Sequence, residues 1–200
     1  EDYYGKPGFK RLLQIMADTY KNHPQKIEEN RKEIVQQLNQ ANQWGRGTAA
    51  LKESVLDEFY SVLLSQFDPD HGGFGEAPKF PSAMSLSFLL RYQNRAEKHT
   101  SLNMIKLSLE EMAQGGIYDQ LGGGFHRYSV DKKWLVPHFE KMLYDNALLP
   151  KAYLEAYQVT GNPYYKEIVE ETLGWVKHEM LDKSGGFYSA QDADSEGEEG

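Results

Sequence analysis

Ionisable side chains are concentrated in one central stretch of the chain. His126 and His138 supply imidazoles, which titrate near neutral pH as a general acid or base must. Glu140 and Asp145 follow closely, and two carboxyl groups on either side of a scissile bond form the acid and base of a glycoside hydrolase. The stretch predicts acid–base chemistry, with His126, His138, Glu140 and Asp145 as catalytic candidates. In the alternative interpretation, the histidines only hydrogen-bond loop carbonyls.

Aromatic and basic neighbours could hold a ligand beside these candidates. Tyr128 and Trp134 present broad apolar faces, and we expect them to stack on a sugar ring. Arg127 and Lys141 are candidates for binding its polar groups. The two cations could equally be salt-bridge partners of the nearby carboxylates, which is the structural alternative.

An acidic segment close to residue 200 adds two more substrate-binding candidates, Asp192 and Asp194. They open the sequence DADSEG, which places oxygen ligands and a glycine as the start of an EF-hand loop does. No helix leads directly into this segment, which argues against a complete EF-hand. Calcium binding stays an open alternative. The spacing of the two histidines matches no familiar zinc motif. We therefore expect no metal and no cofactor.

Helical periodicity dominates the elements that must position these residues. Apolar spacing predicts helices over 8–22, 25–41, 49–66, 82–95, 101–115, 138–159 and 163–181. Short links join some of these helices into antiparallel pairs. Long loops alternate with the short links and carry Gly-Gly-Phe at 72–74, 123–125 and 185–187. This repeat predicts an all-α fold, a partial (α/α)6 toroid of helical hairpins with the Gly-Gly-Phe loops on one rim.

The middle long loop has its own expected local structure. Residues 125–136 alternate around Asp131-Lys132, which is typical of a short β-hairpin. Pro137 then begins the predicted helix over 138–159. That spacing would place His138 and Asp145 on one helix face.

Composition excludes several classes of function. The chain has 200 residues, with 22 Lys and Arg against 30 Asp and Glu, for a net charge of −8. An acidic chain lacks the basic face of a nucleic-acid binder, and its lack of cysteine excludes thiol chemistry in this segment. No apolar run is long enough for a membrane span. We expect a cytoplasmic protein with neither nucleic acid nor membrane as a partner.

Three stretches of the chain resemble a known family, the spermatogenesis-associated, thioredoxin-domain-containing proteins and their bacterial relatives. The stretches are GGFGEAPKFP, GGIYDQLGGGFHRYSVDKKWLVPHFEKMLYDNALL and GGFYSAQDADSEGEEG. YYGKPGFKRLL near the start resembles the segment that ends the thioredoxin-like domain of this family. Members carry that domain first and then an (α/α)6 toroid similar to six-hairpin glycosidases and N-acylglucosamine 2-epimerases.

The resemblance implies a domain organisation and a function. Residues 1–45 would be linker helices that follow a thioredoxin-like domain, and residues 46–200 the first half of the toroid. The implied function is glycosidase-like or epimerase-like chemistry on a small carbohydrate, with the protein's own thioredoxin-like domain as a partner. The alternative is a non-catalytic binding or scaffold module of a thioredoxin-like protein. Substrate, reaction and oligomeric state stay open.

Overall fold

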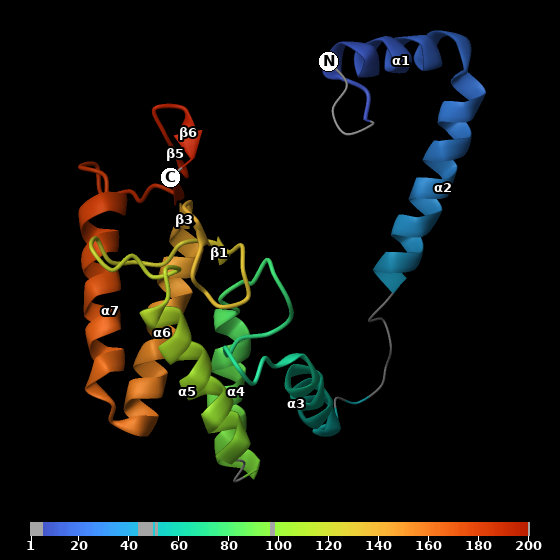
Figure 1. Cartoon of the computed structure of the whole chain (residues 1–200). Coiled ribbons are helices and arrows are strands. Elements are labelled where there is room, and N and C mark those ends of the chain that lie inside the picture. Colours follow the sequence, from blue (N-terminus) through green and yellow to red (C-terminus); the bar gives the residue numbers. More distant parts are fainter. Residues whose placement is uncertain (1–5, 44–49, 51, 97–98, 200) are drawn as a thin grey trace. The chain divides into compact units, whose positions relative to one another are not determined.

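The computed structural model describes residues 6–43, 50, 52–96 and 99–199 (Figure 1). The chain divides into two compact units, Glu1–Leu51 and Lys52–Gly200. The domain boundary expected at residues 45–46 lies outside the described residues. Among the described helices, none is both long and apolar enough to cross a membrane.

The first unit contains two helices, α1 (Phe9–Asn22) and α2 (Pro24–Gln43). Only His23 separates them, because the ring of Pro24 cannot continue a helix from within but fits its first turn. The backbone N–H of His23 donates to the Thr19 carbonyl and closes α1. Apolar side chains of both helices are exposed. The predicted helices over 8–22 and 25–41 are confirmed.

The second unit is mostly helical. Its helices are α3 (Ser54–Gln66), α4 (Ala83–Ala96), α5 (His99–Gln114), α6 (Leu143–Thr160) and α7 (Pro163–Trp175), and α7 continues into the π-helix η1 (Val176–Met180). Helix α4 packs on α3, α5 and α6, while α6 also packs on α7 (Figure 1). The side chain of Asn162 accepts from the Tyr164 N–H at 3.1 Å and caps α7, with Pro163 in its first turn.

Short antiparallel strand pairs interrupt this helical unit, so an all-α description is too narrow. Strand β1 (Tyr128–Ser129) pairs with β2 (Pro137–His138), and β3 (Lys141–Met142) pairs with β4 (Ala190–Gln191). Strand β5 (Asp194–Ser195) pairs with β6 (Glu198–Glu199).

The expected start of a helix at residue 138 is wrong, because α6 begins only at Leu143. His138 pairs with Tyr128 in β1, and Lys141 pairs with Gln191 in β4. These long-range pairings use the backbone of residues 137–142 as strands and override its local helical pattern. His138 and Asp145 therefore share no helix face.

All three Gly-Gly-Phe loops close in the same way, on an aspartate a few residues before the glycines. In each loop the backbone N–H of the aspartate donates to the carbonyl of the second glycine, and the backbone carbonyl of the aspartate accepts from the N–H of the first glycine. The donor–acceptor pairs to the second glycine are Asp68–Gly73 at 3.1 Å, Asp119–Gly124 at 2.9 Å and Asp182–Gly186 at 2.8 Å. The residue before the aspartate forms an antiparallel bridge with the phenylalanine: Phe67–Phe74, Tyr118–Phe125 and Leu181–Phe187.

The phenylalanines of the three loops differ in burial. Phe125 is fully buried and stacks on Tyr153 of α6 at 5.5 Å between ring centroids. Phe74 packs at the edge of the same core, whereas Phe187 is exposed. The phenylalanine therefore packs against the core in the first two loops and not in the third.

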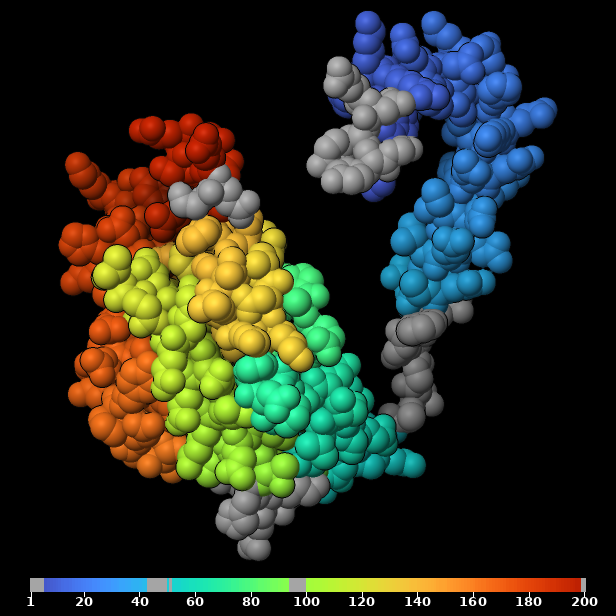
Figure 2. All heavy atoms as spheres, viewed as in Figure 1, coloured from blue at the N-terminus to red at the C-terminus, as the bar shows by residue number. Residues whose placement is uncertain are grey.

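Neighbouring long loops are joined through their backbones. Lys79 of the first loop and Ser129 of the second exchange two hydrogen bonds, of 2.8 and 2.9 Å. The β3–β4 pair joins the second loop to the third. Figure 2 shows the second loop, in yellow, lying against the green first loop on the surface of the unit. This lateral connection determines where the candidate site residues lie.

Candidate functional site

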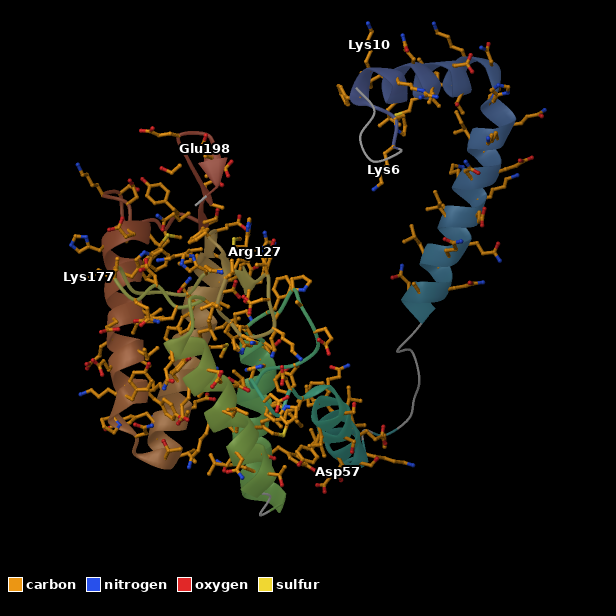
Figure 3. All side chains as sticks on the ribbon, viewed as in Figure 1. Lys6, Lys10, Asp57, Arg127, Lys177 and Glu198 are labelled. Atoms are coloured by element: carbon orange, nitrogen blue, oxygen red, sulfur yellow. The ribbon has the colours of Figure 1, made fainter. Side chains whose placement is uncertain are left out.

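An ion pair between Arg127 and Glu140 lies at the centre of the candidate site, just before α6 (Figure 3). The Arg127 Nη1 donates to Glu140 Oε2 at 2.6 Å, and the Arg127 backbone N–H donates to the Glu140 carbonyl at 2.7 Å. His138 Nε2 lies 3.8 Å from the same Glu140 oxygen. The β1–β2 pairing therefore brings together three residues that the sequence nominated.

Aromatic rings cover one side of His138. The Tyr128 ring stacks on the imidazole, with centroids 4.8 Å apart and planes 19° apart. Phe80 is a second ring neighbour of Tyr128, with centroids 5.0 Å apart, and is half-exposed. Tyr128 thus sits where the sequence expected an aromatic face, although its stacking partner in this structure is a protein side chain.

Asp145 lies in the first turn of α6 and is largely shielded from solvent. Burial raises the pKa of its carboxyl to about 6, while the Arg127 guanidinium acts in the opposite direction. Arg127 therefore influences two carboxylates in different states, an ion-paired Glu140 and an Asp145 that titrates near neutral pH. Carboxyl groups in contrasting environments are typical of acid–base pairs.

His126, next to Arg127 along the chain, is buried. Its Nδ1 lies 2.9 Å from the carbonyl oxygen of Phe139. A carbonyl only accepts, so Nδ1 carries the proton and the lone pair is on Nε2. Burial lowers the pKa of His126, and the Lys141 ammonium adds to this. A neutral imidazole of this tautomer is a potential general base.

Trp134 and Lys141 do not lie where the sequence placed them. Trp134 is fully buried, and its Nε1 donates to the His71 carbonyl at 2.8 Å. Lys141 is 4% exposed and pairs with Asp119 at 2.6 Å. Both side chains are packed inside the fold, so neither presents the exposed surface that we expected from the sequence a ligand to contact.

Asp192 lies between β4 and β5, and Asp194 begins β5 of the exposed β5–β6 hairpin. The Asp192 carboxylate accepts from the Asp194 backbone N–H at 3.4 Å. The contacts of the described side chains do not join either residue to the Arg127–Glu140 pair. Among the described residues, no three His, Asp or Glu side chains gather as metal ligands would.

Three residues that organise the site escaped sequence reasoning. Asp68 and Asp119 close their loops, and Asn146 of α6 binds the backbone of Phe125. Burial raises the pKa of Asp119, but the Gly122 N–H, the Lys141 ammonium and the Leu121 N–H outweigh it and lower the pKa to about 2. An aspartate shortly before each Gly-Gly pair was the available signal.

A cavity of about 380 Å³ opens beside the second loop, between Asp119–Gly123 and the end of α7. Its lining includes Glu171, Trp175 and Glu179. None of the residues nominated from the sequence lines it. The candidate site is therefore defined by its side chains and not by this cavity.

Comparison with curated proteins identifies a clear relative. No protein-family model matches the chain. The chain is 39% identical to spermatogenesis-associated protein 20 of Homo sapiens, over 207 aligned residues covering 100% of this chain and 26% of that protein. The protein of the same name from Mus musculus is 37% identical with the same coverage. The chain thus spans about a quarter of the length of the curated relatives it matches.

Solved structures share the fold. A sugar epimerase from a ruminal bacterium matches with a TM-score of 0.60 and 16% identity, covering 69% of this chain and 40% of that one. Cellobiose 2-epimerase from Spirochaeta thermophila gives 0.59 and 21% identity, covering 70% and 41%. A family 76 glycoside hydrolase from a bovine Bacteroides thetaiotaomicron strain gives 0.55 and 19% identity, covering 73% and 33%.

These matches show that the mostly helical second unit partly matches the (α/α)6 toroids of sugar epimerases and glycosidases. At these identities they show the fold alone. Together with the relationship in sequence, they support one conclusion: the chain is a homologue of spermatogenesis-associated protein 20, matching about a quarter of that protein's length.

Proposed function

We propose that the chain forms the first half of a carbohydrate-active α/α toroid, with its acid–base site around Arg127 at the start of α6. The three long loops would gather on one rim of the ring, which is where loops on a rigid scaffold usually carry a site. Residues before about 45 would link this half-ring to a thioredoxin-like domain of the whole protein. The fold shared with sugar epimerases and a glycoside hydrolase supports the choice of substrate class.

The observation that carries the proposal is the convergence of two imidazoles, two carboxyl groups and one guanidinium before and within the first turn of α6. Glu140, held by Arg127, would accept a proton, and Asp145 would donate one near neutral pH. His126 would act as a second base through Nε2. His138, stacked on Tyr128, would orient the sugar or exchange a proton with it.

Arg127 offers a further group for substrate recognition. Its Nε is buried and finds no hydrogen-bond acceptor among the described residues. An unpaired buried donor is costly, so a substrate hydroxyl or carboxylate that accepts this hydrogen bond would be stabilised. Arg127 would then bind substrate through Nε while it holds Glu140 through Nη1.

Binding of sugars to the full-length protein tests the proposal. We expect a panel of mono- and disaccharides to contain a ligand with a Kd in the millimolar range or below, by calorimetry or NMR. Glu140→Gln should abolish turnover of that ligand, and Arg127→Met should weaken its binding. Glu170→Gln, at an exposed position of α7, is the matched control and should change neither. The absence of any sugar ligand at millimolar concentration would refute the proposal.

The second candidate function is a non-catalytic binding or scaffold module. It is favoured by the number of ionisable groups that serve the fold, with Lys141 buried on Asp119 as the clearest case. In that case Glu140→Gln should lower the stability of the protein and leave binding of every ligand unaffected.

A further inference from the structure

Two lysines of the second unit are buried, which is rare for this residue type. Lys79 is 0% exposed and Lys141 is 4% exposed. The Lys79 ammonium pairs with Asp68 at 2.8 Å, and the Lys141 ammonium pairs with Asp119 at 2.6 Å. Each partner is the aspartate that closes a Gly-Gly-Phe loop. The two ion pairs are thus equivalent contacts in consecutive repeats.

Each ammonium makes a second hydrogen bond. Lys79 Nζ donates to the Lys132 carbonyl at 3.0 Å, in the following loop. Lys141 Nζ donates to the Gly123 carbonyl at 2.9 Å, in the turn that Asp119 closes. Both lysines therefore tie a turn closed by aspartate to a segment outside that turn.

A tryptophan from the following repeat covers each lysine. Lys79 Nζ lies 5.0 Å from the centroid of the Trp134 ring, and Lys141 Nζ lies 4.8 Å from that of Trp175. Such contacts add a cation–π attraction to the ion pair. We call Asp68, Lys79 and Trp134 the first clamp, and Asp119, Lys141 and Trp175 the second clamp.

The same tryptophans explain why the first two loops have glycine at their second position. A Cβ on Gly73 would lie 2.4 Å from Cζ2 of Trp134, and a Cβ on Gly124 would lie 2.8 Å from Cε3 of Trp175. Both glycines also have positive φ, of 73° and 80°. The clamp and the Gly-Gly pair are therefore parts of one repeated arrangement.

Each clamp ends at the candidate site. Lys79 exchanges two backbone hydrogen bonds with Ser129 in β1, next to Tyr128, whose ring stacks on His138. Lys141 directly follows Glu140, so an inward-pointing lysine and a glutamate paired with Arg127 are neighbours along the chain.

We infer that Lys79 and Lys141 are paired positioning residues, the first clamp holding the Tyr128–His138 stack and the second holding Glu140 against Arg127. The inference deepens the proposed function and rests on it in one respect, that the groups around Arg127 form a functional site. A buried ion pair contributes little net stability compared with apolar residues of the same volume. Its retention in two successive repeats is explained by the geometry that it specifies.

Charge-free double variants separate positioning from stability. Asp68→Asn with Lys79→Met removes the first pair, and Asp119→Asn with Lys141→Met removes the second. Each double variant avoids an unpaired buried charge, which is the costly outcome of a single change. Lys177→Met, at an exposed position, is the control.

NMR of the histidine rings gives the readout, with each ring assigned by a His→Gln variant. Loss of the first clamp should move the His138 ring-proton shifts toward those of a solvent-exposed imidazole, because the stack on Tyr128 loosens. Loss of the second clamp should end the preference of His126 for the tautomer protonated at Nδ1. The Phe139 carbonyl that accepts from this Nδ1 directly precedes Glu140, so it should move when Glu140 is no longer held. The control should leave both signals unchanged.

Folded double variants that keep both signals would overturn the inference. If a double variant does not fold, the single Lys79→Met and Lys141→Met variants provide the test, since each removes the buried ammonium and leaves an aspartate that still accepts hydrogen bonds from the backbone of its turn. We expect them to move the same signals by smaller amounts, and unchanged signals would again overturn the inference. These readouts need no sugar, so a protein that binds none would refute the proposed function while the clamps are still tested.

Discussion

Replacing Asn146 by alanine should destabilise the second unit strongly, because this buried side chain binds the backbone of a Gly-Gly-Phe loop. Its Oδ1 accepts from the Phe125 N–H at 2.7 Å, and its Nδ2 donates to the Phe125 carbonyl at 2.9 Å. Nδ2 also donates to the Met142 carbonyl at 3.0 Å. One side chain therefore satisfies both backbone groups of Phe125 and joins the second loop to α6.

The expected magnitude follows from the groups left without partners. Asn146→Ala leaves the N–H and the carbonyl of Phe125 buried and unpaired, at about 1–3 kcal/mol each. We expect a loss of about 3–5 kcal/mol in the free energy of unfolding, a large share of the total for a domain of this size. Asn162→Ala is the matched control, because it removes one partly buried helix cap at about 1 kcal/mol.

Urea unfolding followed by tryptophan fluorescence measures this difference, since Trp134 and Trp175 are both buried in the second unit. Hydrogen exchange at the Phe125 amide gives a local check, because its protection depends on Asn146. If Asn146→Ala costs no more than Asn162→Ala, or if the Phe125 amide keeps its protection, then the loop is held by other contacts and the reasoning is refuted.

Three further predictions concern the loops and the candidate site. Gly73→Ala should destabilise the chain by about 2–5 kcal/mol in the same urea assay, through backbone strain and the clash with Trp134. Gly75→Ala is the control: Gly75 also has positive φ but open space around it, so this change should cost about 1 kcal/mol. Equal losses would contradict the close packing of Trp134 on Gly73. Burial raises the pKa of Asp145 to about 6, so the protonated carboxyl contributes its full stability below about pH 4, and this contribution is lost as the pH rises through 6. Asp145→Asn should therefore be more stable than wild type by about 1–2 kcal/mol at pH 7 and equal to it at pH 3.5. If variant and wild type are equally stable at both pH values, the raised pKa is excluded. Trp134→Phe should cost about 2–3 kcal/mol in thermal unfolding by leaving the His71 carbonyl without its donor, and an unchanged Tm would refute that role.

The helices were predictable because their apolar periodicity is local. Seven segments of helical spacing correspond to α1–α7. The start of α6 was not predictable in this way. Residues 138–142 read as helix, but they pair as strands with Tyr128 and with β4, which lie well apart from them in the sequence.

The candidate site was predictable in its residue types and only partly in its contacts. A concentration of His, Arg and Glu between residues 126 and 140 identified the segment, and the Arg127–Glu140 pair was foreseen as the structural alternative. The burial of Trp134 was not, because it depends on Gly73 of the preceding loop. Lys141 looked like an exposed cation, since its partner Asp119 had not been recognised as the residue that closes the loop.

The order in which the clamps are completed has a consequence for synthesis of the chain. Gly73 and Lys79 leave the ribosome well before Trp134, and Gly124 well before Trp175, so neither of the first two loops reaches its final packing until the next repeat has been translated. A nascent chain that stalls between repeats presents an uncovered glycine turn and a lysine without its aromatic cover. Each of these two repeats thus completes its packing only on the repeat that follows it, and deletion of the following repeat would leave its loop incompletely packed.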